Sequence, residues 1–451
     1  MPAAFSTRNL SGNPQHADGA PNTPARLSLP GEYRAPEEEE ILSRLIEGTP
    51  TVHATTSGFF PGDSQREAQY RMLGELGAPN IPALALLPAR GWRYSLLSRT
   101  VAQLEGMDYD IGESGWRLSF GGSSVRSKDA HLARLSWDSD INMLADAAGR
   151  LSERAGVPWQ GSLNLALLGP VSLGARMHLP RGEAVLSDRG AWRDTVDSML
   201  YCLPSVFARL REALDAAHVP LNLELIEPDL LAAHLGSIRS SSGYSRVRSV
   251  PMPELEELYA RYALIAAEHG VSLSLNVDGN AVIGPSDSAL AKPGLDAMAL
   301  YRAMSGAVAT AEAAPTVDSL PNAESEDRGV EAPEMIFSPD RASTSRMSAA
   351  PLSDARRWES AVALLEAGAR LRLPVVDHIR DKHKPASIPQ RARALYSMLN
   401  AVGADPALLS RISVSEENSA TMTELSIQDA TATLARSVEF ARVLTEIAAE
   451  A

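Results

Sequence analysis

Eight short runs of apolar, strand-forming residues recur along the chain, and longer helical segments separate them. The runs lie at 51–56, 83–87, 162–169, 221–228, 271–277, 334–338, 372–377 and 412–415. Segments between them, such as 253–270 and 431–450, place apolar residues at i, i+3, i+4 and i+7, the period of an amphipathic helix. This alternation predicts an α/β fold built as a single (β/α)8 TIM-type barrel. A doubly wound parallel sheet is the alternative that the same alternation allows.

Two segments differ in composition from the rest of the chain. Residues 1–36 are rich in Pro, Ser, Asn and Gly, which predicts a disordered N-terminal tail. In the stretch at about 284–332, a possible short helix is followed by an acidic run of biased composition. We interpret this stretch as a mobile surface insertion. Because the βα pattern continues on both sides of it, we expect one barrel over residues 37–451, with this insertion.

Charge and cysteine content exclude several classes of protein. The 451 residues carry a net charge of -14, and no basic stripe stands out, which argues against a nucleic-acid partner. No run approaches the ~18 apolar residues that span a bilayer, and the start lacks the pattern of a signal peptide, so we expect a cytoplasmic protein. The single cysteine, Cys202, excludes an intrachain disulfide, and its helical spacing predicts a buried thiol.

On a barrel, the residues just past each strand form the active site. Glu227 ends the run at 221–228 and is a candidate catalytic acid, although a carboxylate held by backbone amides is the alternative. Asp377 and His378 follow the run at 372–377 as a pair that could do acid–base work near pH 7. A histidine exposed in a loop beside Lys382 and Lys384 is the alternative for this pair.

Oxygen-bearing side chains follow two other strands. Asn276 and Asp278 end one run, and Asn418 comes after Glu416 and Glu417 near the C-terminus. Together they would form a polar pocket able to bind a hard cation or a hydroxylated ligand. Capping of loops by the same residue types is the competing interpretation.

Aromatic and arginine residues supply the remaining candidates for substrate binding. Trp116, with Trp92, could stack on a flat ring, although an aromatic residue in a βα loop often only packs. Arg90 and Arg117 are the arginines best placed to bind carboxylate groups of a substrate.

Several short motifs occur in the order found in a known family. They are ATTSGFFPGD (54–63), LLPARG (86–91), SGWRL (114–118), LLGPVSL (167–173), LPRGEAVLSD (179–188), IEP (226–228) and SGYSRVR (242–248). In this collinear order, the chain resembles the catalytic C-terminal barrel of cobalamin-independent methionine synthase, particularly its short actinobacterial-type relatives. The resemblance covers 51–283 and 334–449.

The resemblance implies methyl transfer from a 5-methyltetrahydrofolate to the sulfur of homocysteine, assisted by zinc. Coordination to Zn²⁺ deprotonates a thiol whose pKa is otherwise about 8.5. The family holds the zinc with a His-x-Cys on one strand, a carboxylate from the next strand and a Cys near the last strand. Residues i and i+2 of a strand share a face, so this spacing directs both ligands into the barrel mouth.

This chain departs from the family at each of those positions. The strand at 271–277 offers one of two pairs, Ser274 with Asn276 or Leu275 with Val277. Ser338 or a neighbour stands where the carboxylate is expected, and Asn418 stands in place of the last Cys. None of these pairs contains a thiolate or an imidazole, so we expect no zinc and no other cofactor.

Two further departures affect recognition of the amino acid. The opening Gly-Ser of the family is Gly58-Phe59 here, and the Glu of its E-L-P-A-R-G motif is Leu86. We therefore expect a homologue that has lost methyl transfer and binds a small, folate-like or amino-acid-like molecule or serves in regulation.

Two enzymatic alternatives stay open. One is methyl transfer to a different acceptor, with Glu227 or His378 as the base and a metal that a partner chain could supply. The other is a metal-free, decarboxylase-like reaction on the same type of barrel, which would need arginines that converge on several carboxylates. Neither alternative calls for a nucleic acid or a membrane, and the sequence does not identify a partner protein.

Overall fold

The structure is a computed structural model of residues 1–451. It describes residues 51–119, 127–215, 219–277, 294–313, 330–336, 352–376, 387–417 and 419–450. The predicted tail at 1–36 lies outside these ranges, as does residue 418.

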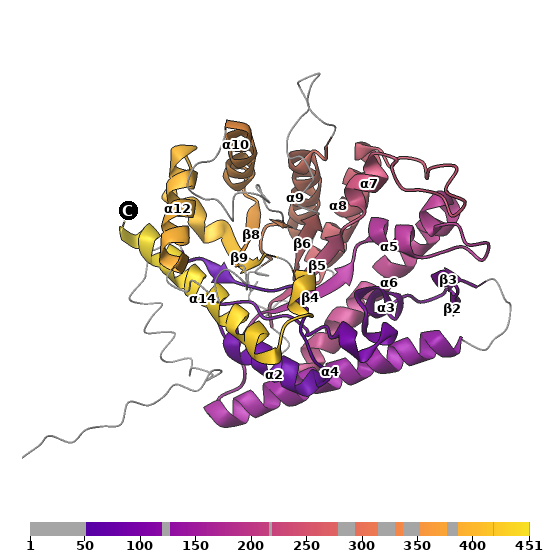
Figure 1. Cartoon of the computed structure of the whole chain (residues 1–451), viewed down its shortest axis with the longest axis horizontal. Helices are drawn as coiled ribbons and strands as arrows, with labels where there is room; N and C mark the ends of the chain where they lie inside the picture. Colours follow the sequence, from indigo (N-terminus) through magenta and orange to yellow (C-terminus); the bar gives the residue numbers. More distant parts are fainter. Residues whose placement is uncertain are drawn as a thin grey trace, which may run out of the picture.

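A curled, parallel sheet of seven strands forms the centre of the molecule (Figure 1). Its strands are β1 (His53–Ala54), β4 (Leu163–Leu168), β5 (Leu221–Glu227), β6 (Val271–Val277), β7 (Glu334–Ile336), β8 (Arg370–Val376) and β9 (Ile412–Glu416). They lie in the order β1-β9-β8-β7-β6-β5-β4, so sequence neighbours from β4 to β9 are also neighbours in space. Each of these strands coincides with a run expected from the sequence.

The expected run at 83–87 lies between the two edge strands without forming a regular ladder. Parallel bridges join Thr55 to Ile81 on the β1 side and Ala83 to Asn164 on the β4 side. Side chains replace part of the ladder here: the amide of Gln69 donates to Ala83 O and accepts from the Ala85 N–H. The chain at 81–86 therefore contacts both edges of the sheet, as an eighth strand would.

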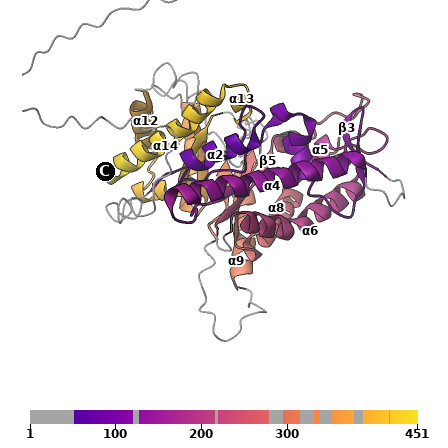
Figure 2. The ribbon, with the colours of Figure 1, turned by 90° about the horizontal axis from the view of Figure 1, so that it is seen from below.

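Helices cover the outer face of the sheet, as Figures 1 and 2 show from two directions. The longer ones are α2 (Gln65–Glu75), α4 (Lys128–Ala155), α6 (Arg189–Ala213), α8 (Met252–Glu268), α9 (Ala297–Ala313), α10 (Leu352–Glu366), α12 (Ser387–Ala401) and α14 (Ile427–Glu450). The shorter ones are α3 (Leu96–Val101), α5 (Pro170–Arg176), α7 (Leu230–His234) and α13 (Ser419–Met422), with 3-10 turns η1 (Pro88–Arg90), η2 (Trp92–Tyr94), η3 (Val185–Ser187) and η4 (Pro406–Arg411). Within the described ranges, no helix is long and apolar enough to cross a membrane.

Local sequence signals set the ends of these helices. Helix α4 begins where the Ser127 hydroxyl accepts the Asp129 N–H, and it ends at Gly156 in a left-handed conformation, with φ +74°. An antiparallel hairpin, β2 (Tyr109–Gly112) and β3 (Gly115–Leu118), lies between α3 and α4.

Part of the stretch predicted as a mobile insertion is a packed helix. Residues 297–313 form α9, whose Leu300, Tyr301 and Met304 are buried, and α9 packs against α8. The periodic apolar side chains explain this difference, because they give the helix a face to bury. Residues 278–293 and 314–329 lie outside the described ranges, so the rest of that prediction is not tested.

Candidate functional site

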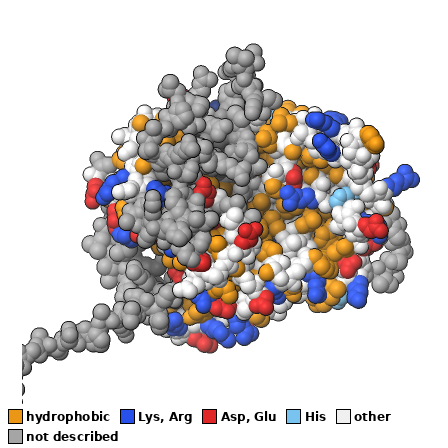
Figure 3. Space-filling view, viewed as in Figure 1, with side chains coloured by type: hydrophobic (Ala, Val, Ile, Leu, Met, Phe, Trp, Pro, Cys, Tyr) orange, Lys and Arg blue, Asp and Glu red, His pale blue; other side chains and the backbone are white. Residues whose placement is uncertain are grey.

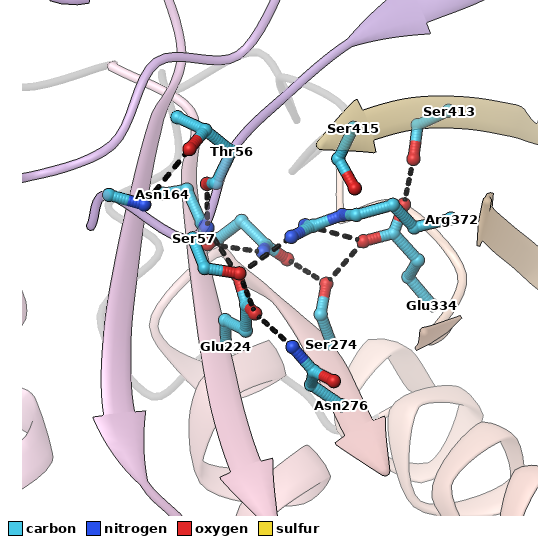
Figure 4. Close-up of polar contacts among 12 residues, drawn as sticks. Thr56, Ser57, Asn164, Glu224, Ser274, Asn276, Glu334, Arg372, Ser413 and Ser415 are labelled. Carbon is cyan, nitrogen blue, oxygen red and sulfur yellow. Dashed lines mark hydrogen bonds and ion pairs between the residues drawn. The ribbon is translucent and has the colours of Figure 1, made fainter. Parts of the chain in front are cut away.

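Polar side chains fill the inner side of the sheet and form one hydrogen-bonded group (Figure 4). We call it the interior cluster; its members are Thr56, Ser57, Asn164, Asn222, Glu224, Ser274, Asn276, Glu334, Arg372, Ser413 and Glu416. Alternation places them together: Asn222 and Glu224 are two residues apart on β5, and β6 pairs in register with Glu224 opposite Ser274. The apolar residues between them, such as Leu223, face the helices instead.

Arg372 connects two carboxylates inside the cluster. Its Nη1 donates to Glu224 Oε2 at 2.7 Å and its Nη2 donates to Glu334 Oε2 at 2.8 Å. The Arg372 side chain is 2% exposed, so burial alone would lower its pKa. The charges of Glu334 and Glu224 outweigh that effect and raise the pKa of Arg372 above its usual range. The guanidinium is therefore a fixed positive charge within the sheet.

Glu224 accepts hydrogen bonds on both carboxylate oxygens. Oε1 accepts from Ser57 Oγ at 2.6 Å and from Asn276 Nδ2 at 2.7 Å, and Oε2 accepts from Asn164 Nδ2 at 2.6 Å as well as from Arg372. Burial would raise the pKa of Glu224, but Arg372 and these three donors together lower it. Glu224 is thus ionised at neutral pH.

The second carboxylate of the pair, Glu334, is held in the same way. Its Oε1 accepts from Ser413 Oγ at 2.6 Å, while its Oε2 lies 2.8 Å from Ser274 Oγ. Ser274 Oγ also lies 3.0 Å from Asn222 Oδ1, so its single proton serves one acceptor at a time. β6, β7 and β9 are thereby connected through side chains.

A third carboxylate, Glu416, lies at the carboxyl end of β9. Its Oε1 accepts from Thr56 Oγ1 at 3.0 Å and from the Ser57 N–H at 3.4 Å. Ser57 therefore links Glu416 to Glu224, and so links the carboxyl end of β1 to β9 and β5. With one guanidinium against three buried carboxylates, the cluster is rich in negative charge and in hydrogen-bond acceptors.

The cluster does not suit zinc. The strand β6 presents Ser274 and Asn276 inward, the first of the two pairs that the sequence allowed, and neither residue is an imidazole or a thiolate. Between Glu224 and Glu334 lies a guanidinium, a positive charge where a cation would need to bind. Across the residues that the structure describes, no group of three His, Cys, Asp or Glu side chains could hold a metal ion.

Glu227 is a buried carboxylate held by backbone amides, the alternative that the sequence analysis gave for it. It lies on the opposite face of β5 from Glu224, where its carboxylate accepts the N–H groups of Val171 and Ser172 at 3.0 and 2.7 Å. The Tyr259 hydroxyl adds a third bond at 2.7 Å. Glu227 lies three residues after Glu224 on β5, so the alternation of the strand turns its side chain to the other face, towards the start of α5. Burial raises the pKa of Glu227, and the three donors oppose that shift.

Arg90 and Arg117 are engaged with different carboxylates. Arg90 Nη1 lies 2.6 Å from Asp140 Oδ1, and its guanidinium stacks 3.6 Å from the ring centre of Tyr94. Arg117 pairs with Asp110 across the β2–β3 hairpin at 2.6 Å. The structure therefore does not bring these two arginines together with Asn276.

Trp116 is 3% exposed and packs edge-on against Trp92 and Tyr109, at ring-centre distances of 5.7 and 5.6 Å. Its Nε1 donates to Ser98 Oγ at 2.9 Å, so the packing alternative describes this residue. Cys202 is a buried thiol, as expected, and burial raises its pKa to about 11.

Four expected site residues, Asp278, Asp377, His378 and Asn418, lie outside the described ranges. Of the remaining candidates, Asn276 joins the interior cluster, as does Glu416 from the same predicted polar pocket. Three other charged members of the cluster, Glu224, Glu334 and Arg372, were not predicted. A signal was present: a charged residue in the middle of an apolar strand run must point to a polar partner, because an unpaired buried charge is costly.

No family model matches the chain, and no curated protein matches it. Among solved structures, the B12-independent methionine synthase from Shewanella sp. W3-18-1, in complex with selenomethionine, is similar at 10% sequence identity with a TM-score of 0.42. The alignment covers 88% of this chain and 98% of that one. At this identity and TM-score, the likeness does not establish a family for the chain.

Proposed function

We propose that this protein is a divergent (β/α)8 barrel of the methionine-synthase type that binds a small polar molecule at the carboxyl ends of its strands. On this proposal the segment 81–86 completes the barrel as its eighth strand, and zinc-dependent methyl transfer has been lost. The ordered sequence motifs support the ancestry.

The observation that carries the binding function is the position of Ser57, Asn276 and Glu416. All three lie at the carboxyl ends of β1, β6 and β9, the end at which barrel proteins hold their ligands. Asn276 is partly exposed, and its Nδ2 donates to Glu224; Figure 4 shows its amide oxygen pointing away from that carboxylate. A fixed acceptor beside a carboxylate-rich interior favours a ligand that donates hydrogen bonds, such as a hydroxylated or amino-bearing molecule.

The loss of the zinc reaction is supported by the charge pattern of the interior cluster. Arg372 forms ion pairs with both Glu224 and Glu334, so a positive charge already lies where a metal would have to bind between them. Without a metal, only a few per cent of a free thiol is ionised at pH 7, which leaves homocysteine a weak nucleophile.

The decarboxylase-like alternative receives no comparable support. Such a reaction on a polycarboxylate needs several arginines at one place, whereas Arg90 and Arg117 are each paired with a separate carboxylate. Methyl transfer to another acceptor is distinguished by a methyl-transfer assay, the second of the two experiments below.

Native mass spectrometry of the purified full-length protein tests the binding function. We expect a co-purified small molecule that is lost in Asn276→Ala but kept in Asn400→Ala, a matched change on the exposed side of α12. Asn276→Ser, which keeps a hydrogen-bonding group, and circular dichroism of each variant separate lost binding from lost folding. Identical ligand retention in all variants would refute the site.

A second experiment tests the loss of methyl transfer. Protein supplied with Zn²⁺ is analysed for bound metal and assayed for methionine formed from homocysteine and methyltetrahydrofolate. We expect neither. One zinc per chain with methionine above background would restore the family's reaction, and methylation of another thiol would favour the alternative acceptor.

A further inference from the structure

A small exposed hairpin follows α7, on a different part of the molecule from the interior cluster. An antiparallel bridge pairs Arg239 with Arg246, and backbone bonds from Ser240 N to Ser245 O and from Val247 N to Ile238 O flank it. In this pattern the two bridged residues form a non-hydrogen-bonded pair, whose Cα atoms lie about 4.5 Å apart with the side chains on one face. Two positive side chains are therefore held directly opposite each other.

A third arginine shares that face. Val247 is buried while Arg246 and Arg248 are exposed, so alternation along this extended stretch places both arginines on the solvent side. Among the described residues, no carboxylate forms an ion pair with Arg239, Arg246 or Arg248. This contrasts with the exposed Arg176 and Arg261, which each pair with an aspartate at 2.5 Å.

The loop after α5 brings a fourth arginine to the hairpin. Glu183 accepts from the Ser241 N–H at 3.0 Å and from Ser241 Oγ at 2.7 Å, which fastens the turn at 179–183 to the hairpin. Arg181 lies in that turn, is exposed and has no ion-pair partner in the described part of the chain. In Figure 1 the loops after α5 and α7 lie at one edge, and Figure 3 shows Lys and Arg side chains at that edge.

Like charges directly opposite each other on a β ladder destabilise it, whereas a pair of opposite charges stabilises it. Here the neighbouring carboxylate, Glu183, is bound to Ser241, and its hydrogen bonds there lower its pKa. That contact also shows that the hairpin's backbone and hydroxyl donors accommodate an oxyanion. The guanidinium groups of the hairpin, by contrast, have no ion-pair partner among the described residues, and they would suit a ligand with several anionic oxygens.

We propose that the exposed face of residues 238–248 is a binding site for a phosphoryl group. Paired guanidinium groups match the oxygens of phosphate through charge-assisted, two-pronged hydrogen bonds. Tyr244, 98% exposed at the tip of the hairpin, offers a ring surface for an organic group attached to that phosphate. The site is independent of the proposed ligand site in the interior cluster.

Titration calorimetry with inorganic tripolyphosphate tests this site on the full chain. We expect binding at low ionic strength that weakens about tenfold or more in R239Q/R246Q, because two charge-assisted contacts are lost. The matched control R150Q/R302Q removes two exposed arginines from helices α4 and α9 and should change affinity less than about twofold. R239K/R246K, which keeps the charge without the planar fork, should bind with an intermediate affinity.

Vesicles identify the source of the phosphoryl group. The group belongs to a lipid if two results hold. The wild type must bind phosphatidylcholine vesicles that contain phosphatidic acid, and R239Q/R246Q must weaken this binding by the same factor as it weakens the binding of tripolyphosphate. If only tripolyphosphate binds, the group belongs to a free molecule. No binding of either probe, or an equal loss in R150Q/R302Q, would overturn the proposal, since surface charge in general would then explain the result.

Discussion

Removal of the Arg372 guanidinium is the most informative perturbation of the fold. In Arg372→Met the volume is kept, while Glu224 and Glu334 lose the charge that lies 2.7 and 2.8 Å from their oxygens. Breaking a buried ion pair from one side costs about 3–5 kcal/mol, because a carboxylate stays buried without its partner. Against a usual stability of about 5–15 kcal/mol, this variant should fold but unfold at much lower denaturant concentration.

The pH dependence gives this prediction its sharpest form. In the wild type the folded pKa of Glu224 is lowered below its ordinary value of 4.5, so its stabilising contribution is present above that value. That contribution is lost as the pH falls through the lowered pKa. In Arg372→Met burial dominates and raises the pKa of Glu224, so the penalty is largest at neutral pH and diminishes on acidification. The difference between the two proteins should therefore shrink from pH 8 towards about pH 5.

Urea unfolding followed by circular dichroism at several pH values measures this difference. The control is Arg209→Met, which breaks an exposed pair with Asp138 at 2.6 Å and should cost about 0–1 kcal/mol. The combined variant Glu224→Gln, Glu334→Gln, Arg372→Met should recover part of the lost stability, since the two carboxylates that Arg372 paired with are then neutral. A loss below about 1 kcal/mol, or one that does not change with pH, would refute the reasoning.

Three further outcomes are expected. Glu227→Ala should lower the unfolding free energy by about 2–4 kcal/mol in urea titrations, because the donors of Val171, Ser172 and Tyr259 lose their acceptor; Glu227→Gln should cost less. Gly169→Ala should cost about 1–3 kcal/mol in the same assay, because the new Cβ would overlap the Glu227 carboxylate, whereas alanine at an exposed helical glycine with open space around it should be neutral or stabilising. Arg246→Gln should raise the melting temperature slightly at low salt by removing a like-charge pair, and added salt should abolish the gain.

The sequence predicted the strands well because both faces of this sheet are buried. Runs such as 163–168 and 221–227 are recognisable by their apolar outward residues, which pack under the helices. Helix α9 was predicted only as a short helix, because the alanines and small residues in its second half resemble a low-complexity stretch. The run at 83–87 was predicted as a strand, but Pro82 and the hydrogen bonds of Gln69 leave the segment 81–86 joined to its neighbours by single bridges.

The candidate site was harder to predict because its chemistry depends on pairing between distant strands. Glu224 and Arg372 are 148 positions apart, and nothing local to either residue reveals the other. For Glu227 the sequence left two interpretations open, a catalytic acid or a carboxylate held by backbone amides, and counting the alternation along β5 favours the second. That count places Glu224 and Asn276 inside and Glu227 outside. A charged residue within an apolar strand is therefore better evidence for the interior of such a sheet than a charged residue at its end.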